Sequence, residues 1–256
     1  MNPPIQFRFF LLSISLVLFA CRPSIEMLED ISYDYYPIEE GKYRIYQVDS
    51  IVYNAFICQT LTNSYQIKEV TGNVIIDGEG EKAYAVKRYK RLNGNAPWKL
   101  EEVWTEKIQQ QQLQRIENNQ RWVKMVFPIQ EQQMWDGLSY IKSDTSFEIS
   151  GSSIQIYKDW GDFEYQKTGS SFVDTSQTVP AIYPDVVEVA QADAENQIEK
   201  RYAKEVYAKN IGLVYRELWI LDCQAAGCGA CQYNTPWKER ARKGYILVES
   251  LIEHNY

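Results

Sequence analysis

The sequence predicts a mainly β fold, in which a large antiparallel meander forms a curved sheet or half-open barrel with few short helices. Three observations lead to this prediction. Apolar and polar residues alternate with a period of two over many short segments, which is typical of strands with one buried face. Gly and Asn residues separate these segments at the spacing of turns. The chain of 256 residues contains 19 Tyr and 7 Trp, which favour pleated, half-buried surfaces, and it shows no long amphipathic helical pattern.

The residue pattern in the first half of the domain predicts a strand-and-turn meander over residues 42–128. Aromatic and β-branched residues are frequent in each predicted strand, and turn residues bound it. Gly72 interrupts one strand and predicts a β-bulge. In another strand, Trp98, Leu100 and Trp104 share one face. The predicted strands are 42–53, 65–76, 83–92, 98–104, 109–117 and 121–127, and the clearest turns are 77–80, 93–97 and 118–119.

The second half has a weaker pattern. Residues 128–184 contain short aromatic runs separated by glycines, and we expect looser structure there. Residues 195–209 are ambiguous: their Ala, Glu and Lys content favours a helix, whereas their Tyr and Val residues before the turn at 210–212 favour a hairpin with residues 213–221. The other predicted strands are 185–192 and 245–252.

The N-terminus resembles a lipoprotein export signal. Arg8 is the one charged residue before Cys21, and an apolar-and-small run extends from Phe9 to Ala20. A basic residue, a short apolar core and a small residue before the cleavage point are typical of a secretory signal. The run is also shorter than the roughly 20 residues of a membrane-spanning helix. We therefore expect residues 1–20 to be removed and Cys21 to carry lipid. The alternative is an ordinary signal peptide, with this cysteine as a free or disulfide-bonded thiol.

Cleavage would leave 236 residues, which suit one large β domain or two small ones. We expect a lipidated tether over 21–34 and a single β-rich domain over 35–256 with a cysteine-containing C-terminal segment. In the lipoproteins that this signal resembles, an Asp after the lipidated cysteine favours the inner membrane. Arg22 stands there instead and favours the outer membrane, with the membrane face left open.

The charge of the chain argues against nucleic acid as a partner. The formal net charge is −7, and it becomes −8 once Arg8 is removed with the signal. Nucleic acid phosphates attract clusters of Lys and Arg, and the chain has no basic block. The densest basic run, Lys87 to Arg91, alternates between the two faces of a predicted strand, and we interpret it as solvated.

Four cysteines besides Cys21 indicate disulfides. An even number in an oxidising compartment predicts two disulfides with three possible connectivities. One alternative is a zinc site in which Cys58 or His254 completes three C-terminal thiolates. Another is a redox-active Cys-x-x-Cys at 228–231, although residues 232–236 have the composition of a loop and not of the helix that such a motif precedes. Free thiols are the last alternative. The four cysteines are Cys58, Cys223, Cys228 and Cys231.

Several short motifs resemble those of uncharacterised bacterial lipoproteins of the Bacteroidota type. The resemblance spans most of the mature chain. It implies a β-rich lipoprotein domain of unassigned role, it carries no catalytic residues across, and it favours a strand over 195–209. The motifs are Tyr35-Tyr36-Pro37 with Gly41 and Tyr43, Arg88-Tyr89-Lys90-Arg91 with Trp98, the strand from Lys124 to Pro128 with Trp135-Asp136-Gly137, and the stretch from Tyr207 to Val214.

No pattern identifies a catalytic site, and we expect no enzyme activity, no metal and no cofactor. His254 is the single histidine and lies near the C-terminus, so neither a Ser-His-Asp triad nor a His-based metal cluster is indicated. Paired carboxylates can hydrolyse glycosides, but the acidic candidates lack a signature spacing, and we interpret them as solvated. These candidates are Glu101 with Glu102, Asp159 with Asp162, and Asp174.

The tryptophans allow two interpretations. They can fill the core of the sheet, or they can line a concave surface that binds an apolar chain or stacks on sugar rings. The candidates for such a surface are Trp98, Trp104, Trp122 and Trp135. We therefore expect a non-enzymatic binding or assembly module of the bacterial cell envelope, whose partners are the membrane, through its lipid, and an apolar or glycan ligand or an envelope protein. The alternatives are a structural or interaction subunit of an envelope complex and an unrecognised carboxylate-dependent hydrolase.

Overall fold

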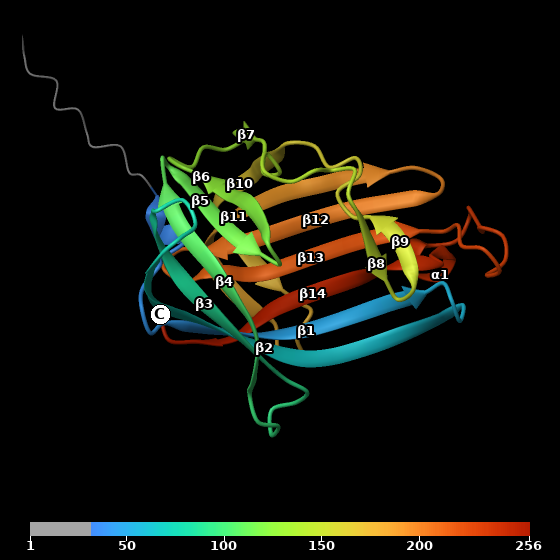
Figure 1. Cartoon of the computed structure of the whole chain (residues 1–256), viewed down its shortest axis with the longest axis horizontal. Helices are drawn as coiled ribbons and strands as arrows, with labels where there is room; N and C mark the ends of the chain where they lie inside the picture. Colours follow the sequence, from blue (N-terminus) through green and yellow to red (C-terminus); the bar gives the residue numbers. More distant parts are fainter. Residues whose placement is uncertain (1–31) are drawn as a thin grey trace, which may run out of the picture.

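The structure is a computed structural model that describes residues 32–256. One antiparallel sheet of 12 strands curls into a nearly closed barrel, which confirms the predicted fold class (Figure 1). Its strand order is β6-β5-β4-β3-β2-β1-β14-β13-β12-β11-β10-β7, and β8 and β9 form a separate two-stranded sheet. Within the described residues, no helix has the length and apolar character needed to cross a bilayer.

The strands of the first half are β1 Tyr43–Asn54, β2 Gln59–Ile76, β3 Lys82–Arg91, β4 Lys99–Gln109, β5 Gln112–Glu117 and β6 Gln120–Val126. Those of the second half are β7 Met134–Trp135, β8 Ser146–Ile149, β9 Ser152–Gln155, β10 Phe163–Asp174, β11 Ala181–Glu195, β12 Glu199–Ala208, β13 Gly212–Asp222 and β14 Lys243–His254. The helices are the short 3-10 helix η1 Tyr33–Tyr35 and the single-turn helix α1 Trp237–Arg240.

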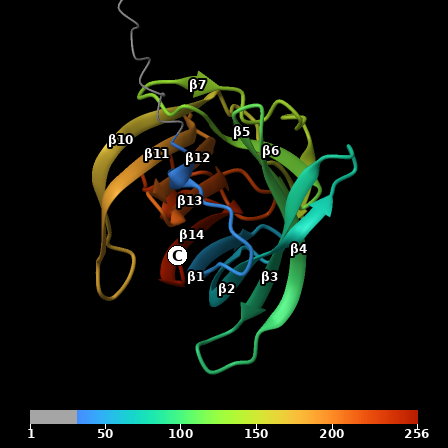
Figure 2. The same ribbon diagram turned by 90° about the vertical axis from the view of Figure 1, so that its left-hand side faces the viewer.

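Two sets of contacts complete the barrel. The first and last strands of the described residues, β1 and β14, pair along ten residues in the middle of the sheet. The edge strands β6 and β7 are joined by single hydrogen bonds: Val123 N–H donates to the Gly137 carbonyl at 3.1 Å, and Trp135 Nε1 donates to the Val123 carbonyl at 2.8 Å. Figure 2 shows the strands arranged around the barrel axis, and the β3–β4 hairpin extends beyond the body of the barrel.

Most element predictions are confirmed, and the errors have local causes. Residues 199–208 form strand β12 and the hairpin with β13, and the ladder shifts its register around Gly72 as expected for a bulge. The predicted strand over 109–117 begins later, because Gln110 and Gln111 form a turn with positive φ. The sequence pattern missed β10, whose ladder with β11 contains three register shifts that break its alternation.

The prediction that Leu100 and Trp104 share one face of their strand is wrong, because a bulge in β4 lies between them. Arg88 pairs with Glu102, whereas the next residue of β3, Tyr89, pairs with Leu100, so one extra residue stands in β4. Since each residue shift turns side chains to the other face of a strand, Trp104 faces the barrel interior and Leu100 faces outward, where it is 56% exposed.

The segment between β7 and β10 covers part of the barrel interior. Its β8–β9 hairpin lies in front of β13 and β14 in Figure 1. Arg201 of β12 donates a hydrogen bond to the Gln155 carbonyl at 3.1 Å, and Lys158 forms an ion pair with Glu199. This part of the chain, which the sequence left unassigned, therefore forms one wall of the region described next.

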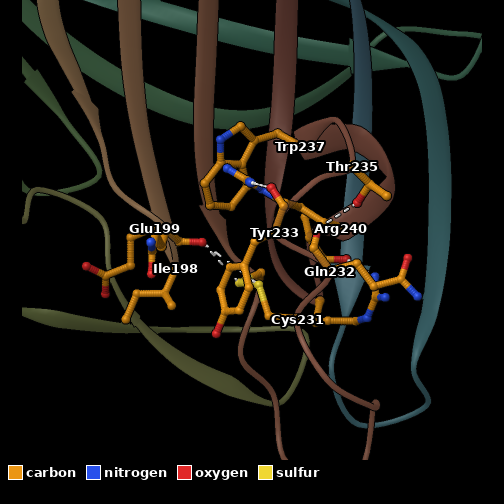
Figure 3. Close-up of a disulfide and its surroundings, with 12 residues drawn as sticks. Ile198, Glu199, Cys231, Gln232, Tyr233, Thr235, Trp237 and Arg240 are labelled. Atoms are coloured by element: carbon orange, nitrogen blue, oxygen red, sulfur yellow. Dashed lines mark hydrogen bonds between the residues drawn. A yellow bond between two sulfur atoms is a disulfide. The ribbon is translucent and has the colours of Figure 1, made fainter.

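Two disulfides join the loops at the end of the barrel near α1. Cys58 bonds to Cys228 and links the β1–β2 turn to the β13–α1 loop, while Cys223 bonds to Cys231 within that loop. Figure 3 shows the second disulfide beside Ile198, with the loop folded back so that Arg240 donates to the Tyr233 carbonyl at 2.7 Å. The predicted disulfides are confirmed, and the connectivity that the sequence left open is resolved.

Candidate functional site

The barrel interior contains a buried cluster of alternating charges. Six side chains form a closed ring of ion pairs with N···O distances between 2.6 and 3.5 Å. Lys124 and Glu205 extend the ring by bridging Glu117 and Arg216 at distances of 2.8–3.5 Å. We call these eight residues the charged cluster. The ring runs Glu69, Arg88, Glu249, Arg216, Glu117, Arg115 and back to Glu69.

Strand alternation explains how the charged cluster assembles. Glu69 on β2 is cross-strand neighbour to Arg88 on β3, and Arg216 on β13 is the neighbour of both Glu205 and Glu249. Facing residues of opposite charge on adjacent strands stabilise one another. The curvature of the sheet then brings β5 and β6 over β13, so that pairs also form across the interior.

The neighbouring cations hold two carboxyl groups of the charged cluster, Glu117 and Glu205, in their ionised state. Burial alone would raise the pKa of Glu205, but Lys124 and Arg216 outweigh it and lower the pKa to about 2. Burial likewise opposes ionisation of Glu117, and Lys124, Arg216 and Arg115 hold the pKa of that carboxyl well below its ordinary value. Buried charges are tolerated when each has partners of opposite charge, which this arrangement supplies.

Glu106 lies beside the charged cluster and differs from it. Burial raises the pKa of Glu106, whose nearest cationic atom, Arg115 Nε, is 3.9 Å away. The Tyr36 hydroxyl donates a hydrogen bond to its Oε2 at 2.7 Å, and its Oε1 has no hydrogen-bond partner among residues 32–256. This carboxyl therefore takes up a proton more easily than those of Glu69, Glu117 and Glu205, whose pKa values are lowered.

A cleft of about 370 Å³ opens onto the charged cluster, and we call it the aromatic cleft. Glu117, Asn118, Gln120 and Trp122, from the β5–β6 hairpin, form one wall. The opposite wall comes from the segment between β7 and β10. Leu218 of β13 also lines the cleft. The remaining lining residues are Phe147, Ile156, Tyr157, Trp160 and Tyr245. Cavities of a few hundred Å³ with mostly apolar walls and a few polar groups are typical of small-molecule sites.

The aromatic residues of the cleft hold one another in place. The ring centroids of Trp122 and Tyr157 are 5.2 Å apart, and those of Tyr157 and Trp160 are 5.4 Å apart, both in edge-to-face arrangements. Phe147 meets Tyr157 in the same way at 5.6 Å. Such pairs contribute about 0.5–1.5 kcal/mol beyond the area they bury. The walls of the cleft are therefore formed before any ligand enters.

A larger cleft of about 550 Å³ lies between the β2–β3 turn and strand β4, but it is a weaker candidate. Its apolar lining includes Ile76 and Val103, which are 65% and 56% exposed. Asp77, its acidic residue on the turn, is already bound to Lys107 at 2.6 Å. A cleft with exposed walls buries little of a ligand's surface, whereas small-molecule sites bury most of it.

The four candidate tryptophans occupy different surroundings. Trp122 lines the aromatic cleft. Trp104 is buried between the guanidinium groups of Arg88 and Arg115, whose Cζ atoms lie 3.8 and 4.8 Å from its ring centroid. Trp135 packs in the main core against Phe163 and Tyr165, and Trp98 lies beside Arg91 near the tip of the β3–β4 hairpin. The structure therefore places one of the four in the cleft.

Two interpretations of charged residues need correction. Arg88, assigned to a solvated basic run, faces inward and joins the charged cluster. Asp174, assigned to a solvated face, is fully buried and accepts hydrogen bonds from Ser176 and Gln177. Charged residues are rarely buried unless they are paired. Arg88 pairs with Glu69 on the neighbouring strand β2 and with Glu249 on β14, which is distant in sequence. Of the other acidic candidates, Asp159, Asp162 and Glu101 are exposed as expected, whereas Glu102 is half-buried and lies 3.5 Å from Arg88.

Sequence reasoning missed most residues of the site. Glu117, Arg216 and Glu249 belong to strands in which charged residues alternate with apolar ones, a pattern that also describes an ordinary solvated face. The interval of two residues between Arg115 and Glu117 was the available signal, because it places opposite charges on the same face. Cys21, the predicted lipidation site, lies outside the described residues. Among those residues, no group of His, Cys, Asp and Glu has the arrangement of a metal site.

Comparisons with known proteins give a distant structural likeness. No protein-family model matches the chain. No curated protein matches it either. Among solved structures, the chain is similar to a crystal structure from Bacteroides fragilis, described as an exported protein with a YmcC-like fold. That similarity covers 86% of this chain and 98% of the other, at 12% sequence identity and a TM-score of 0.34.

Proposed function

We propose that this chain is an exported, lipid-anchored protein of the bacterial cell envelope that binds a ligand in the aromatic cleft and catalyses no reaction. The observation that carries the proposal is the cleft itself, about 370 Å³ in volume, whose aromatic walls pack against one another next to a cluster of oppositely charged side chains. A preformed site of this kind lowers the entropy lost on binding.

Two features support the location in the envelope. The N-terminal sequence up to Cys21 has the pattern of a lipoprotein signal. The two disulfides of the folded domain are typical of proteins that fold in an oxidising compartment. An outer-membrane location follows from Arg22 after the lipidated cysteine and is part of the proposal.

The protonation states support binding and not catalysis. A general acid or base works best with a pKa near the working pH. Glu117, the carboxylate that lines the cleft, is held ionised by its three cations, and Glu205 has a pKa of about 2. Glu106 has a raised pKa, but it does not line the cleft. These observations also weigh against a carboxylate-dependent hydrolase.

The proposal is tested by blocking the cleft. Leu218→Trp introduces a large side chain at a lining position, and Leu61→Trp makes the same change at an exposed position of β2 outside the cleft as a matched control. The full chain and both variants are purified from membranes, and bound small molecules are extracted and compared by mass spectrometry. We expect a shared ligand in the wild type and in Leu61→Trp that Leu218→Trp lacks. Equal extracts from all three would contradict the proposal.

A second candidate function, an interaction subunit of an envelope complex, is favoured by the β3–β4 hairpin. Leu92 and Leu100 near its tip are 73% and 56% exposed, and Lys90 and Lys99 flank them. Exposed apolar residues of this kind are found at protein-binding surfaces. Crosslinking in membranes tests this candidate: loss of a crosslinked species in a Leu92→Ser, Leu100→Ser variant would support it, and an unchanged pattern would weigh against it.

A further inference from the structure

We infer that the ligand of the aromatic cleft is an uncharged saccharide, whose hydroxyl groups donate hydrogen bonds to Glu117. This inference rests on the proposed function and adds the chemical class of the ligand. It follows from three properties of the lining residues: an unpaired carboxylate oxygen, unpaired neutral polar groups, and aromatic rings arranged around them.

Glu117 uses its two carboxylate oxygens differently. The closest approaches of Arg115, Lys124 and Arg216, at 3.4–3.5 Å, are all to Oε1. Oε2 accepts no hydrogen bond from the described residues and is not fully buried, although the side chain as a whole is nine-tenths buried. A charged acceptor that has no partner and opens onto a cleft is suited to a ligand that donates.

Neutral polar groups line the same cleft as this oxygen. Tyr245 is half-buried there, and its hydroxyl makes no hydrogen bond within residues 32–256. Gln120 accepts a hydrogen bond from the Tyr157 hydroxyl through Oε1, which leaves its amide N–H groups for a ligand. Trp160 Nε1 is buried without a partner in this part of the chain. A hydroxyl both donates and accepts, so one type of ligand group can satisfy each of these atoms.

The surroundings of Glu117 argue against two other ligand classes. A ligand ammonium would meet the positive charges of Arg115, Lys124 and Arg216 close behind the carboxylate. An acyl chain would cover Oε2 and the Tyr245 hydroxyl without pairing them, at a cost of about 1–3 kcal/mol for each neutral group and more for a charged one. Sugar hydroxyls avoid both penalties.

The aromatic walls suit the remaining surface of a sugar. A pyranose ring has two faces of C–H groups and an edge of hydroxyls. The rings of Trp122, Tyr157 and Trp160 lie within about 6 Å of one another and form the apolar part of the lining. The polar groups come from Glu117 and Gln120 of the β5–β6 hairpin and from Tyr245 of β14. Apolar faces and polar edges of the ligand therefore meet matching surfaces of the cleft.

The experiment combines a glycan array with titrations of the full chain. The labelled protein is screened on an array of bacterial and mammalian glycans, and the strongest glycan is then titrated while tryptophan fluorescence is recorded. Palmitate is titrated in parallel as an acyl-chain probe. We expect glycan binding, with affinity reduced roughly three- to tenfold in Tyr245→Phe, which removes one neutral hydrogen bond. Tyr140→Phe, at an exposed position outside the cleft, serves as the matched control with unchanged affinity.

Glu117→Gln is expected to weaken glycan binding by roughly tenfold or more, because a charge-assisted hydrogen bond becomes a neutral one. Its thermal unfolding is measured alongside, since the same residue belongs to the charged cluster, and Tyr245→Phe decides the question if this variant does not fold. Palmitate binding without glycan binding, or wild-type affinity in Tyr245→Phe, would overturn the saccharide inference and leave the proposed function standing. If neither probe binds, and the same small molecules are extracted from Leu218→Trp as from the wild type, the saccharide inference and the proposed function both fail.

Discussion

Arg216 of β13 reaches across the barrel interior and donates a hydrogen bond from Nη2 to Glu117 Oε1 of β5 at 3.4 Å. Five strands separate β5 from β13 in the sheet, so this contact is made possible by the curvature of the barrel. Arg216 also binds Glu205 at 2.8 Å and Glu249 at 3.1 Å. One side chain thus fixes the position of β5, which forms a wall of the cleft, relative to β12 and β14.

Replacing Arg216 by Met should lower the free energy of unfolding by about 3–5 kcal/mol, because Glu117, Glu205 and Glu249 would remain buried with fewer partners. Chemical denaturation followed by circular dichroism measures the change. Lys90→Met breaks an exposed pair with Glu101 and serves as the control, with an expected effect of about 0–1 kcal/mol. Equal effects of the two substitutions would show that the charged cluster does not stabilise the barrel.

The charged cluster should make the protein sensitive to acid. Glu69, Glu117 and Glu205 have folded-state pKa values below the ordinary 4.5, so the stability they contribute is present above that pH and is lost as the pH falls toward about 2. Glu106, with a raised pKa, acts in the opposite direction but is a single group. The melting temperature should therefore fall steeply between pH 5 and pH 3. A melting temperature that stays constant over this interval would contradict the account.

The two disulfides should differ in their effect on stability. Cys58–Cys228 closes a loop with a sequence separation of 170, and Cys223–Cys231 closes one of 8. If the bonds act by restricting the unfolded chain, the first contributes about 5 kcal/mol and the second about 2.5 kcal/mol. Both cysteines of each pair are replaced by Ala, and denaturant unfolding shows which double variant loses more free energy of unfolding. A larger loss from the short loop would indicate that packing around Cys223 and not loop entropy is the main contribution.

Cys21→Ser should release the protein from the membrane without preventing export. One acyl chain binds a bilayer only marginally and several chains bind it stably, because each buried methylene contributes about 0.8 kcal/mol. In fractionation and detergent phase partitioning, the variant should appear in the soluble envelope fraction and no longer with the membrane. Cys58→Ser is the control and should remain with the membrane. Membrane association of both variants would exclude lipid on Cys21 as the anchor.

Alternation and turn residues were enough to predict the β class and most strands. The meander from β1 to β6 follows the predicted segments closely, because most of its turns are encoded locally by Gly or Asn; the turn at Gln110 and Gln111 is the exception. The sequence could not predict β10, since three register shifts hide its period. It also could not predict the bulge that turns Leu100 outward, because one extra residue changes the face without changing the composition.

The candidate site depended on long-range pairing and was mostly hidden from the sequence. Trp122 was a candidate, but its neighbours in the cleft, Tyr157 and Trp160, lie in the segment with the weakest pattern. The pairing of Glu117 with Arg216 requires a closed barrel, and a charged residue on a strand otherwise predicts a solvated face. The cysteines were the exception, because their even number predicted disulfides without any knowledge of the fold.

Mass spectrometry of the protein extracted from membranes, recorded in native and in denaturing conditions, tests for both the lipid anchor and the bound ligand. We expect a denatured mass that begins at Cys21 with two or three acyl chains and rises on alkylation only after the two disulfides are reduced. We also expect a native mass that is larger by one bound saccharide, which Leu218→Trp loses and Leu61→Trp keeps. An unmodified N-terminus and identical native and denatured masses would contradict an anchored, ligand-binding barrel.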